Sequence, residues 1–249
     1  MRVQGYVIHT RPFQDNKVLL DVLTQEQGLI RAVWRRNTKE ARVTPGSFLL
    51  HELELSGRGE LKTARSVEPL ESAASLQGNG LYSAFYLHEL LERLVPTNLP
   101  VEPLFILYQW VIVNLRQGVP IAPLLRRFEV GLFDELGMGI NLSCTARGEV
   151  LQSTQLYQFH GKFGLRPYLG DQPKVRPMIY LDGATAKGYT AGLWSNRSVL
   201  SMAKELHRAW LDAALGGREL KSRDLLPTAE FAGERLWQVP VFRFEESIK

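Results

Sequence analysis

The period of the hydrophobic pattern changes near residue 70, and this change constrains the fold more than any other feature of the chain. Before it, apolar residues form short runs separated by turn residues such as Pro45-Gly46 and Gly57. After it, they recur every three or four residues, as on one face of an α-helix. We therefore expect an α+β chain in which strands come first and helices follow.

The first 70 residues predict five strands. Their expected bounds are residues 3–10, 17–24, 28–34, 47–55 and 61–67. Five short strands in such a length suit a small closed barrel, which can be OB-like or SH3-like. The periodicity alone does not choose between these two barrels.

Three amphipathic helices follow, the first ended by Pro96, the second by Gly118 and the third with Gly137 as its C-terminal cap. Their short connections predict an antiparallel helical core. A further helix is expected over residues 197–215 and a short basic one over 219–226, with a Gly- and Pro-rich, irregular stretch over 140–195. The small, polar segment near residues 70–80 predicts a barrel domain of residues 1–75 and a mainly α-helical domain of residues 76–249.

Several classes of protein are disfavoured. The single cysteine, Cys144, allows no internal disulfide and no four-cysteine zinc site, so we expect no metal. The chain contains no run of 18 apolar residues, so no membrane span is expected. The N-terminus lacks the apolar region of a secretory signal. A cytoplasmic protein is expected.

Familiar catalytic motifs are also missing. There is no GxxxxGK[ST] phosphate loop and no GxSxG nucleophile elbow. The segment from His88 to Glu92 resembles a zinc-binding helix, but Glu92 stands where the second histidine belongs. We expect no enzyme, no cofactor and no metal, and an active site assembled from scattered residues remains the alternative.

Positive charge is concentrated near the N-terminus. The chain carries a formal net charge of +4, and residues 1–70 hold eleven lysines and arginines against eight acids. A basic barrel with an aromatic side chain is typical of proteins that bind single-stranded nucleic acid. Trp34 is the candidate for base stacking, although it can equally be a core residue, and the charges can be ordinary solvated surface. The basic candidates are Arg31, Arg35, Arg36, Lys39 and Arg42, then Arg58, Lys62 and Arg65, and near the other end Arg218, Lys221 and Arg223.

The opening GYVIHTRPFQDNKVLLDVLTQEQGLIRAV resembles the signature of the RecO family of recombination mediators. Later matches, in the same order, are SGRGELKTARSVEP, LYSAFYLHELLERL, LLRRFEVGLFDELGMGINLSC and GGRELKSRDLL. The His-x-Arg-Pro strand end adds Arg11 to the expected DNA-binding residues. The matching positions of the opening are His9, Arg11, Pro12, Leu20, Thr24, Gly28 and Arg31.

The resemblance implies an N-terminal OB-fold and a helical C-terminal domain. It also implies binding to single- and double-stranded DNA, annealing of complementary strands, and contact with the acidic, Phe-ending tail of the single-stranded-DNA-binding protein. With RecR, such a protein helps to load RecA, without hydrolysing nucleotide. A monomer associated with the nucleoid is expected, and an RNA-binding OB-fold factor is the alternative.

Two departures from the family are visible. Many members carry Gly-Ala-Arg in the loop after the third strand, where this chain reads Arg36-Asn37-Thr38. Some members hold zinc with four cysteines, whereas this chain has Cys144 alone.

The partner's acidic tail requires an apolar slot with arginines at its rim. The third helix offers Arg126 and Arg127 beside apolar residues, so its surface is the candidate, with a solvated arginine pair as the alternative. The four candidate residues are Leu124, Arg126, Arg127 and Phe128.

Overall fold

The computed structural model describes residues 1–14, 16–35, 45–72, 75–170 and 178–225. These residues form two compact units. The first comprises Met1–Gly118 together with the segment that begins at Leu220, and the second comprises Val119–Glu219. The domain boundary expected between residues 75 and 76 stays a prediction.

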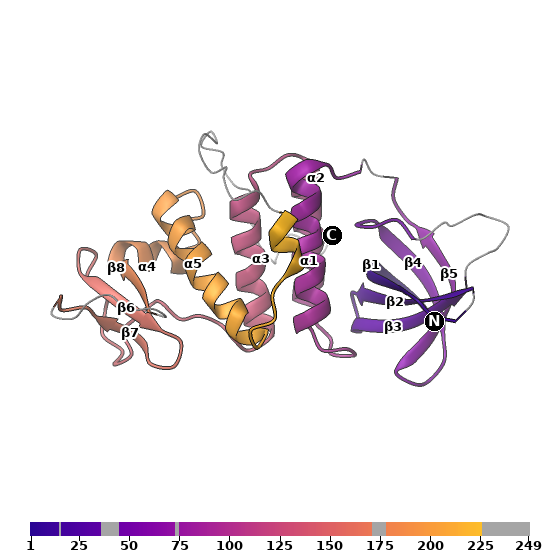
Figure 1. Cartoon of the computed structure of the whole chain (residues 1–249), viewed down its shortest axis with the longest axis horizontal. Coiled ribbons are helices and arrows are strands. Elements are labelled where there is room, and N and C mark those ends of the chain that lie inside the picture. Colours follow the sequence, from indigo (N-terminus) through magenta and orange to yellow (C-terminus); the bar gives the residue numbers. More distant parts are fainter. Residues whose placement is uncertain (15, 36–44, 73–74, 171–177, 226–249) are drawn as a thin grey trace. The chain divides into compact units, whose positions relative to one another are not determined.

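The first unit contains a closed β-barrel with the strand order β1-β2-β3-β5-β4 (Figure 1). Antiparallel pairing of β1 with β4 closes the barrel, and β3 pairs in parallel with β5. This five-stranded closed barrel is an OB-fold, as the family resemblance implied. The strands are β1 (Arg2–Pro12), β2 (Lys17–Thr24), β3 (Gly28–Arg35), β4 (Leu50–Ser56) and β5 (Leu61–Pro69).

Strand alternation fills the barrel. In β2, a run that looks continuously apolar, Val18, Leu20 and Val22 are fully buried in the barrel core. The strand β4 begins later than the expected residue 47, because Phe48 has a φ of 64° and turns the chain before the strand starts. The remaining core residues are Val3, Val7, Ile30, Ala32, Leu53, Leu55 and Ala64.

The turn between β2 and β3 explains the Thr-x-x-x-Gly part of the sequence signature. Gly28 has a φ of 68°, and a Cβ placed on it would lie 1.8 Å from the carbonyl oxygen of Leu99. The Thr24 hydroxyl donates to the Gly28 carbonyl oxygen at 2.9 Å and accepts from the Gln27 amide at 3.2 Å. Glycine is required here because both the backbone conformation and the close approach exclude a side chain.

Two helices, α1 (Gly78–Leu94) and α2 (Glu102–Arg116), pack against the barrel within the first unit. Tyr6 of β1 meets the rings of Phe105 and Tyr108 at centroid distances of 5.7 and 5.0 Å. His88 of α1 lies 2.6 Å from the Tyr108 hydroxyl, through Nε2, and its ring is 4.4 Å from that of Phe48. The barrel and these helices therefore share an aromatic core.

The buried ring of His88 predicts acid sensitivity. Burial lowers its pKa from 6.5 to about 3. Because the folded-state pKa is depressed, neutral His88 contributes its full stability above pH 6.5, and this contribution is lost as the pH falls toward 3. In a His88→Gln variant, the free energy of unfolding should fall with acidification less steeply, by about 1.4 kcal/mol per pH unit. Urea unfolding between pH 4 and 6 measures this slope, and equal slopes in the two proteins would contradict the prediction.

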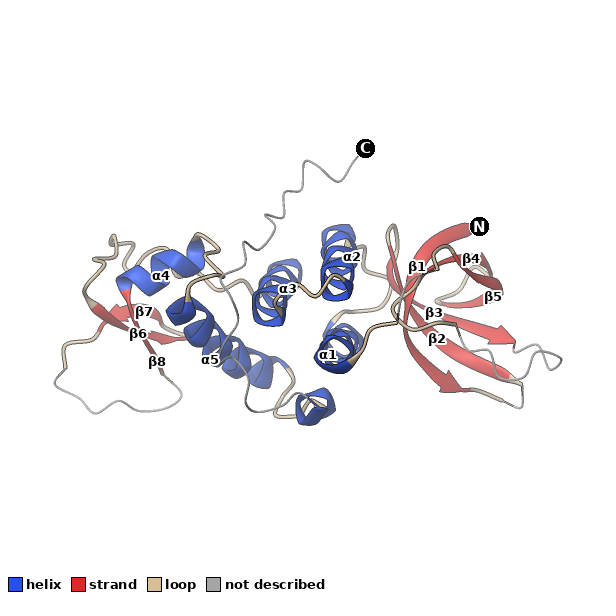
Figure 2. Cartoon of the chain, turned by 90° about the horizontal axis from the view of Figure 1, so that it is seen from above, coloured by secondary structure: helices blue, strands red, loops and turns tan. Residues whose placement is uncertain are grey.

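The second unit combines helices with a small sheet of order β7-β6-β8. Residues 140–195 are therefore more regular than expected. The elements over residues 164–167 and 183–190 are too short for their hydrophobic residues to show a clear period in the sequence. The helices α4 and α5 cover one face of this sheet (Figure 2). The elements are α3 (Ile121–Glu135), β6 (Leu156–His160), β7 (Gly164–Pro167), β8 (Ile179–Asp182), α4 (Gly183–Thr190) and α5 (Arg197–Ala214).

The helices expected to form one antiparallel core are divided between the units. The first two, α1 and α2, belong to the first unit, whereas α3 packs with α5 in the second. Gly137 follows α3 with a φ of 68°, as its predicted role as a C-terminal cap requires. Among the described residues, no helix has both the length and the apolar character needed to cross a bilayer.

Candidate nucleic-acid interface

The outer surface of β2 and β3 carries basic side chains in register. Lys17 pairs directly with Arg35, and Asp21 pairs directly with Arg31. Since directly paired residues of an antiparallel ladder point to the same side of the sheet, the Lys17 and Arg35 side chains are neighbours on this surface. Arg35 is exposed, and it has no ion pair with a carboxylate of the described residues. Sequence reasoning missed Lys17, although the alternation of β2 contains the signal.

A buried carboxylate organises two of the predicted arginines. Asp21 is 1% exposed, and its oxygens accept from Arg11 Nη2 at 2.6 Å and from Arg31 Nε at 3.0 Å. Both guanidinium groups remain about half exposed. Asp21 therefore fixes two cations at the surface and neutralises part of their charge, which the sequence analysis did not foresee.

The same carboxylate belongs to a cluster with His9 and Glu92. The His9 Nδ1 atom lies 3.1 Å from a Glu92 oxygen and 3.7 Å from an Asp21 oxygen. One ligand atom from each of the three residues lies within 4.8 Å of the others, so the cluster has the donors of a cation site. Two guanidinium groups already bind Asp21, however, and they would repel a metal ion. The geometry favours an ion-pair cluster, and the absence of a metal stays a prediction.

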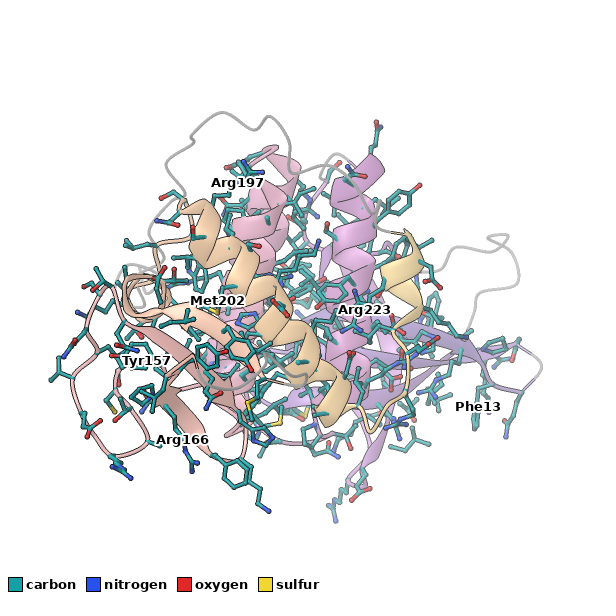
Figure 3. All side chains as sticks on the ribbon, turned by 60° about the vertical axis from the view of Figure 1, so that its left-hand side comes forward. Phe13, Tyr157, Arg166, Arg197, Met202 and Arg223 are labelled. Carbon is teal, nitrogen blue, oxygen red and sulfur yellow. The ribbon has the colours of Figure 1, made fainter. Side chains whose placement is uncertain are left out.

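A shallow depression of about 280 Å³ lies on this side of the barrel. Its apolar lining comes from Phe13, which follows β1, and from Leu19 and Leu61 (Figure 3 labels Phe13). Arg31, Glu60, Thr97 and Asn98 add charged and polar groups to the same depression. The strand 2–3 face and the loops beside it are where OB-folds bind oligonucleotides, so Phe13 joins the candidate residues.

The turn between β4 and β5 places further basic side chains in the first unit. Arg58 is exposed in this turn. Lys62 lies 3.5 Å from the Gly57 carbonyl oxygen through its Nζ atom, and Arg65 lies 3.7 Å from Glu54. Arg65 is therefore partly neutralised, whereas Arg58 has no ion pair with a described carboxylate.

Trp34 is partly buried and packs against the barrel core. Its role in base stacking stays a prediction. Arg36, Lys39 and Arg42 lie outside the described residues. Of the basic cluster between residues 31 and 42, the described interface therefore contains only Arg31 and Arg35.

The late basic motif is divided between the two units. Arg218 belongs to the second unit, where its Nε atom donates to the Leu215 carbonyl oxygen at 3.2 Å. Lys221 and Arg223 belong to the first unit, in the 3-10 helix η1 (Lys221–Leu225). This helix, shorter and later than the one expected over residues 219–226, packs against α1.

The contact between η1 and α1 centres on Glu89. Its carboxylate accepts from the backbone amides of Lys221 and Ser222 at 3.0 and 2.8 Å, and from the Ser222 hydroxyl at 2.5 Å. Burial raises the pKa of Glu89, but these hydrogen bonds and the neighbouring Arg93 outweigh it and lower the pKa below its ordinary value. The ionised carboxylate therefore holds the η1 backbone.

The expected slot for an acidic tail does not have the form that the sequence suggested. Leu124 and Phe128 are both 0% exposed, so they are core residues and their placement at a surface slot needs correction. Arg126 is bound to Glu129 at 2.8 Å, with only 11% of its side chain exposed. Arg127 is half-buried, and burial lowers its pKa. A role for α3 in tail binding stays a prediction.

Glu129 is the centre of a buried polar network in the second unit. Its second carboxylate oxygen lies 2.6 Å from His207 Nδ1, and His207 Nε2 lies 2.8 Å from the Tyr189 hydroxyl. The side chains of Glu129 and His207 are both 0% exposed. Burial lowers the pKa of His207, although Glu129 opposes this shift.

Comparison with known proteins identifies the family. The family model described as "Recombination protein O N terminal" matches residues 1–73, and "Recombination protein O C terminal" matches residues 76–224. The chain belongs to the RecO family. It is 36% identical over 225 residues to the DNA repair protein RecO of Stutzerimonas stutzeri (strain A1501), covering 90% of this chain and 93% of that protein. It is 37% identical over 220 residues to that of Pseudomonas paraeruginosa (strain DSM 24068 / PA7), covering 88% and 92%.

Proposed function

We propose that this member of the RecO family acts in recombinational DNA repair by binding single- and double-stranded DNA and annealing complementary strands, without catalysing a reaction. The observation that carries the proposal is the basic outer face of the barrel. Lys17, Arg35 and Arg58 have no ion pair with a described carboxylate there, and an apolar depression containing Phe13 lies on the same barrel. Such a combination suits phosphate neutralisation with limited base contact.

The proposed mechanism is electrostatic. Guanidinium and ammonium groups neutralise phosphates on two strands, which reduces the repulsion between them and allows bases to pair. The release of counterions from the DNA drives binding, so affinity falls as salt rises. No base-specific contact is needed, which suits a protein that must act on any sequence.

The proposed partners come from the family resemblance. The protein engages the acidic tail of the single-stranded-DNA-binding protein and, together with RecR, helps to load RecA onto coated strands. The half-buried Arg127 is the described cation on α3 that supports tail binding. Binding to the nucleoid follows from the proposed affinity for DNA.

A charge variant tests the barrel face. Replacing both Lys17 and Arg35 with alanine should flatten the plot of log affinity against log salt by about 1.4 for single-stranded DNA, since each lost phosphate contact removes roughly 0.7. Fluorescence anisotropy with a labelled oligonucleotide, from 20 to 200 mM salt, measures this slope.

The matched control removes the same charge elsewhere. A variant with Arg2→Ala and Arg208→Ala loses two positive charges, and its slope should stay close to that of the unchanged protein. Equal slopes in all three proteins would exclude Lys17 and Arg35 from the interface. Competition by RNA of the same sequence separates the proposed function from an RNA-binding OB-fold factor, because contacts to the sugar distinguish the two nucleic acids.

A further inference from the structure

We propose that the hairpin formed by β6 and β7 in the second unit is an additional contact surface for single-stranded DNA, centred on Phe163. Phe163 is 48% exposed, and its ring stacks with the His160 ring at a centroid distance of 4.8 Å. The Arg166 guanidinium lies over the same ring at 5.1 Å, and the Lys162 ammonium at 5.9 Å. An exposed aromatic ring with two adjacent cations combines base stacking with phosphate binding.

The hairpin holds these side chains in a defined arrangement. A Cβ on Gly161 would lie 2.5 Å from the Trp210 ring, so the turn packs directly on α5. The Trp210 indole donates to the Met138 carbonyl oxygen at 2.9 Å, which fixes the ring. The amide of Lys162 donates to His160 Nδ1 at 3.1 Å and orients the imidazole that stacks with Phe163. Preorganisation of this kind lowers the entropic cost of binding.

Among the residues that the structure describes, no carboxylate forms an ion pair with the cations of this surface. Lys162 and Arg166 are exposed, and within the described ranges neither has an ion pair, in contrast to Arg11 and Arg31 of the barrel. A third cation, Arg147, lies in a segment that is hydrogen-bonded to β7. The Ala146 amide donates to the Leu165 carbonyl oxygen at 2.7 Å, which brings the exposed Arg147 next to β7.

The sheet face around the hairpin also favours a single strand as the ligand. Tyr157, Phe159 and Leu165 point into the core under α4 and α5. The opposite face carries the cross-strand neighbours Gln158, Arg166 and Tyr180. A face with aromatic and basic side chains offers rings to exposed bases, which a duplex keeps stacked inside. Phe163 lies in a turn, where it presents a ring to stack on rather than a slot that an apolar peptide end would fill.

This inference rests on the proposed function and extends that function to the second unit. It assigns one strand-binding surface to each compact unit, so that one molecule has two surfaces with which to hold the two strands that it anneals.

Three variants of the full chain test the hairpin. Phe163→Ala should weaken binding to single-stranded DNA at least about fivefold with little change in salt dependence, because it removes stacking but no charge. Phe163→Tyr should restore affinity. The Lys162→Ala and Arg166→Ala double variant should flatten the salt plot by about 1.4. The probe is a labelled oligothymidylate, and thermal unfolding verifies that each variant is folded.

The control is a double variant with Arg197→Ala and Arg208→Ala, which removes two exposed charges from α5 in the same unit. Figure 3 shows Arg197 well apart from Arg166. This control should keep both the affinity and the salt slope of the unchanged protein.

The outcomes separate this inference from the proposed function. If the hairpin variants bind like the unchanged protein while the Lys17 and Arg35 variant is weakened, only the hairpin assignment is overturned. If they keep DNA binding but lose binding to an acidic peptide ending in Phe, the surface belongs to a peptide and the inference is wrong. If the unchanged protein ignores the oligonucleotide even at 20 mM salt, both proposals fail.

Discussion

Replacing Asp21 with asparagine is expected to lower the free energy of unfolding by about 2–4 kcal/mol and, at the same time, to strengthen binding to single-stranded DNA. The buried carboxylate binds Arg11 and Arg31, and an amide cannot balance their charge. Removing one partner of a buried ion pair leaves the other groups poorly compensated, which is strongly destabilising. The loss of the negative charge, however, releases the positive potential of both guanidinium groups toward phosphates.

Urea unfolding measures the first effect, and anisotropy at fixed salt measures the second, which we expect to be an increase of about three- to tenfold in affinity. Glu68→Gln is the matched control, because it removes one negative charge from an exposed position on β5. It should leave stability within about 0.5 kcal/mol. A fall in affinity for the Asp21 variant would contradict neutralisation and would mean that Asp21 holds the arginines in a binding geometry.

Replacing Glu129 with alanine is expected to cost about 3–5 kcal/mol of stability, the range measured when one member of a buried ion pair is removed. The substitution leaves Arg126 without its carboxylate and removes the partner of His207 Nδ1. It also opens a space in a region where both Glu129 and His207 have no exposed surface. Many natural domains have a total stability of only about 5–15 kcal/mol, so partial unfolding at 37 °C is expected.

Chemical unfolding followed by tryptophan fluorescence measures the loss. Trp194 packs against Tyr189, whose hydroxyl contacts His207, so part of the fluorescence reports on this unit, beside the signal of Trp34 and Trp110 in the first unit. The control is Glu135→Ala at the end of the same helix, where the side chain has no ion pair with a described residue, and it should change stability by less than about 1 kcal/mol. A loss below 1 kcal/mol for Glu129→Ala would show that the network contributes little.

The sequence predicted the barrel well because each strand has a clear local signal. The bounds of β2 agree with those expected, and β3 differs by one residue. The prediction failed where the backbone departs from the pattern of its side chains: Phe48 adds an apolar residue to a turn, so β4 seemed to begin too early. Short elements such as β7 and α4 have too few residues for a period, and only their tertiary contacts define them.

The candidate site was less predictable than the fold. Sequence counts of charge could not show that Asp21 lies between Arg11 and Arg31, because the three residues meet only through strand register. Lys17 became a candidate through the same register, and Phe13 because it lines the depression beside β2 and β3. On α3, the sequence predicts the apolar neighbours of the arginines at the surface, but Leu124 and Phe128 are buried. Helical periodicity identifies an apolar stripe and does not say whether a partner or the protein's own core covers it.

The hydrogen bonds that Glu89 accepts from Lys221 and Ser222 have a consequence for synthesis. These residues are separated by more than 130 positions in the chain, yet they belong to the same compact unit. At translation rates of about 5–20 residues per second, the last piece of the first unit leaves the ribosome roughly ten seconds after α1 has been made. A chain that stalls before Leu220 would therefore lack the groups that donate to Glu89, and the first unit is completed only after this late segment has been made.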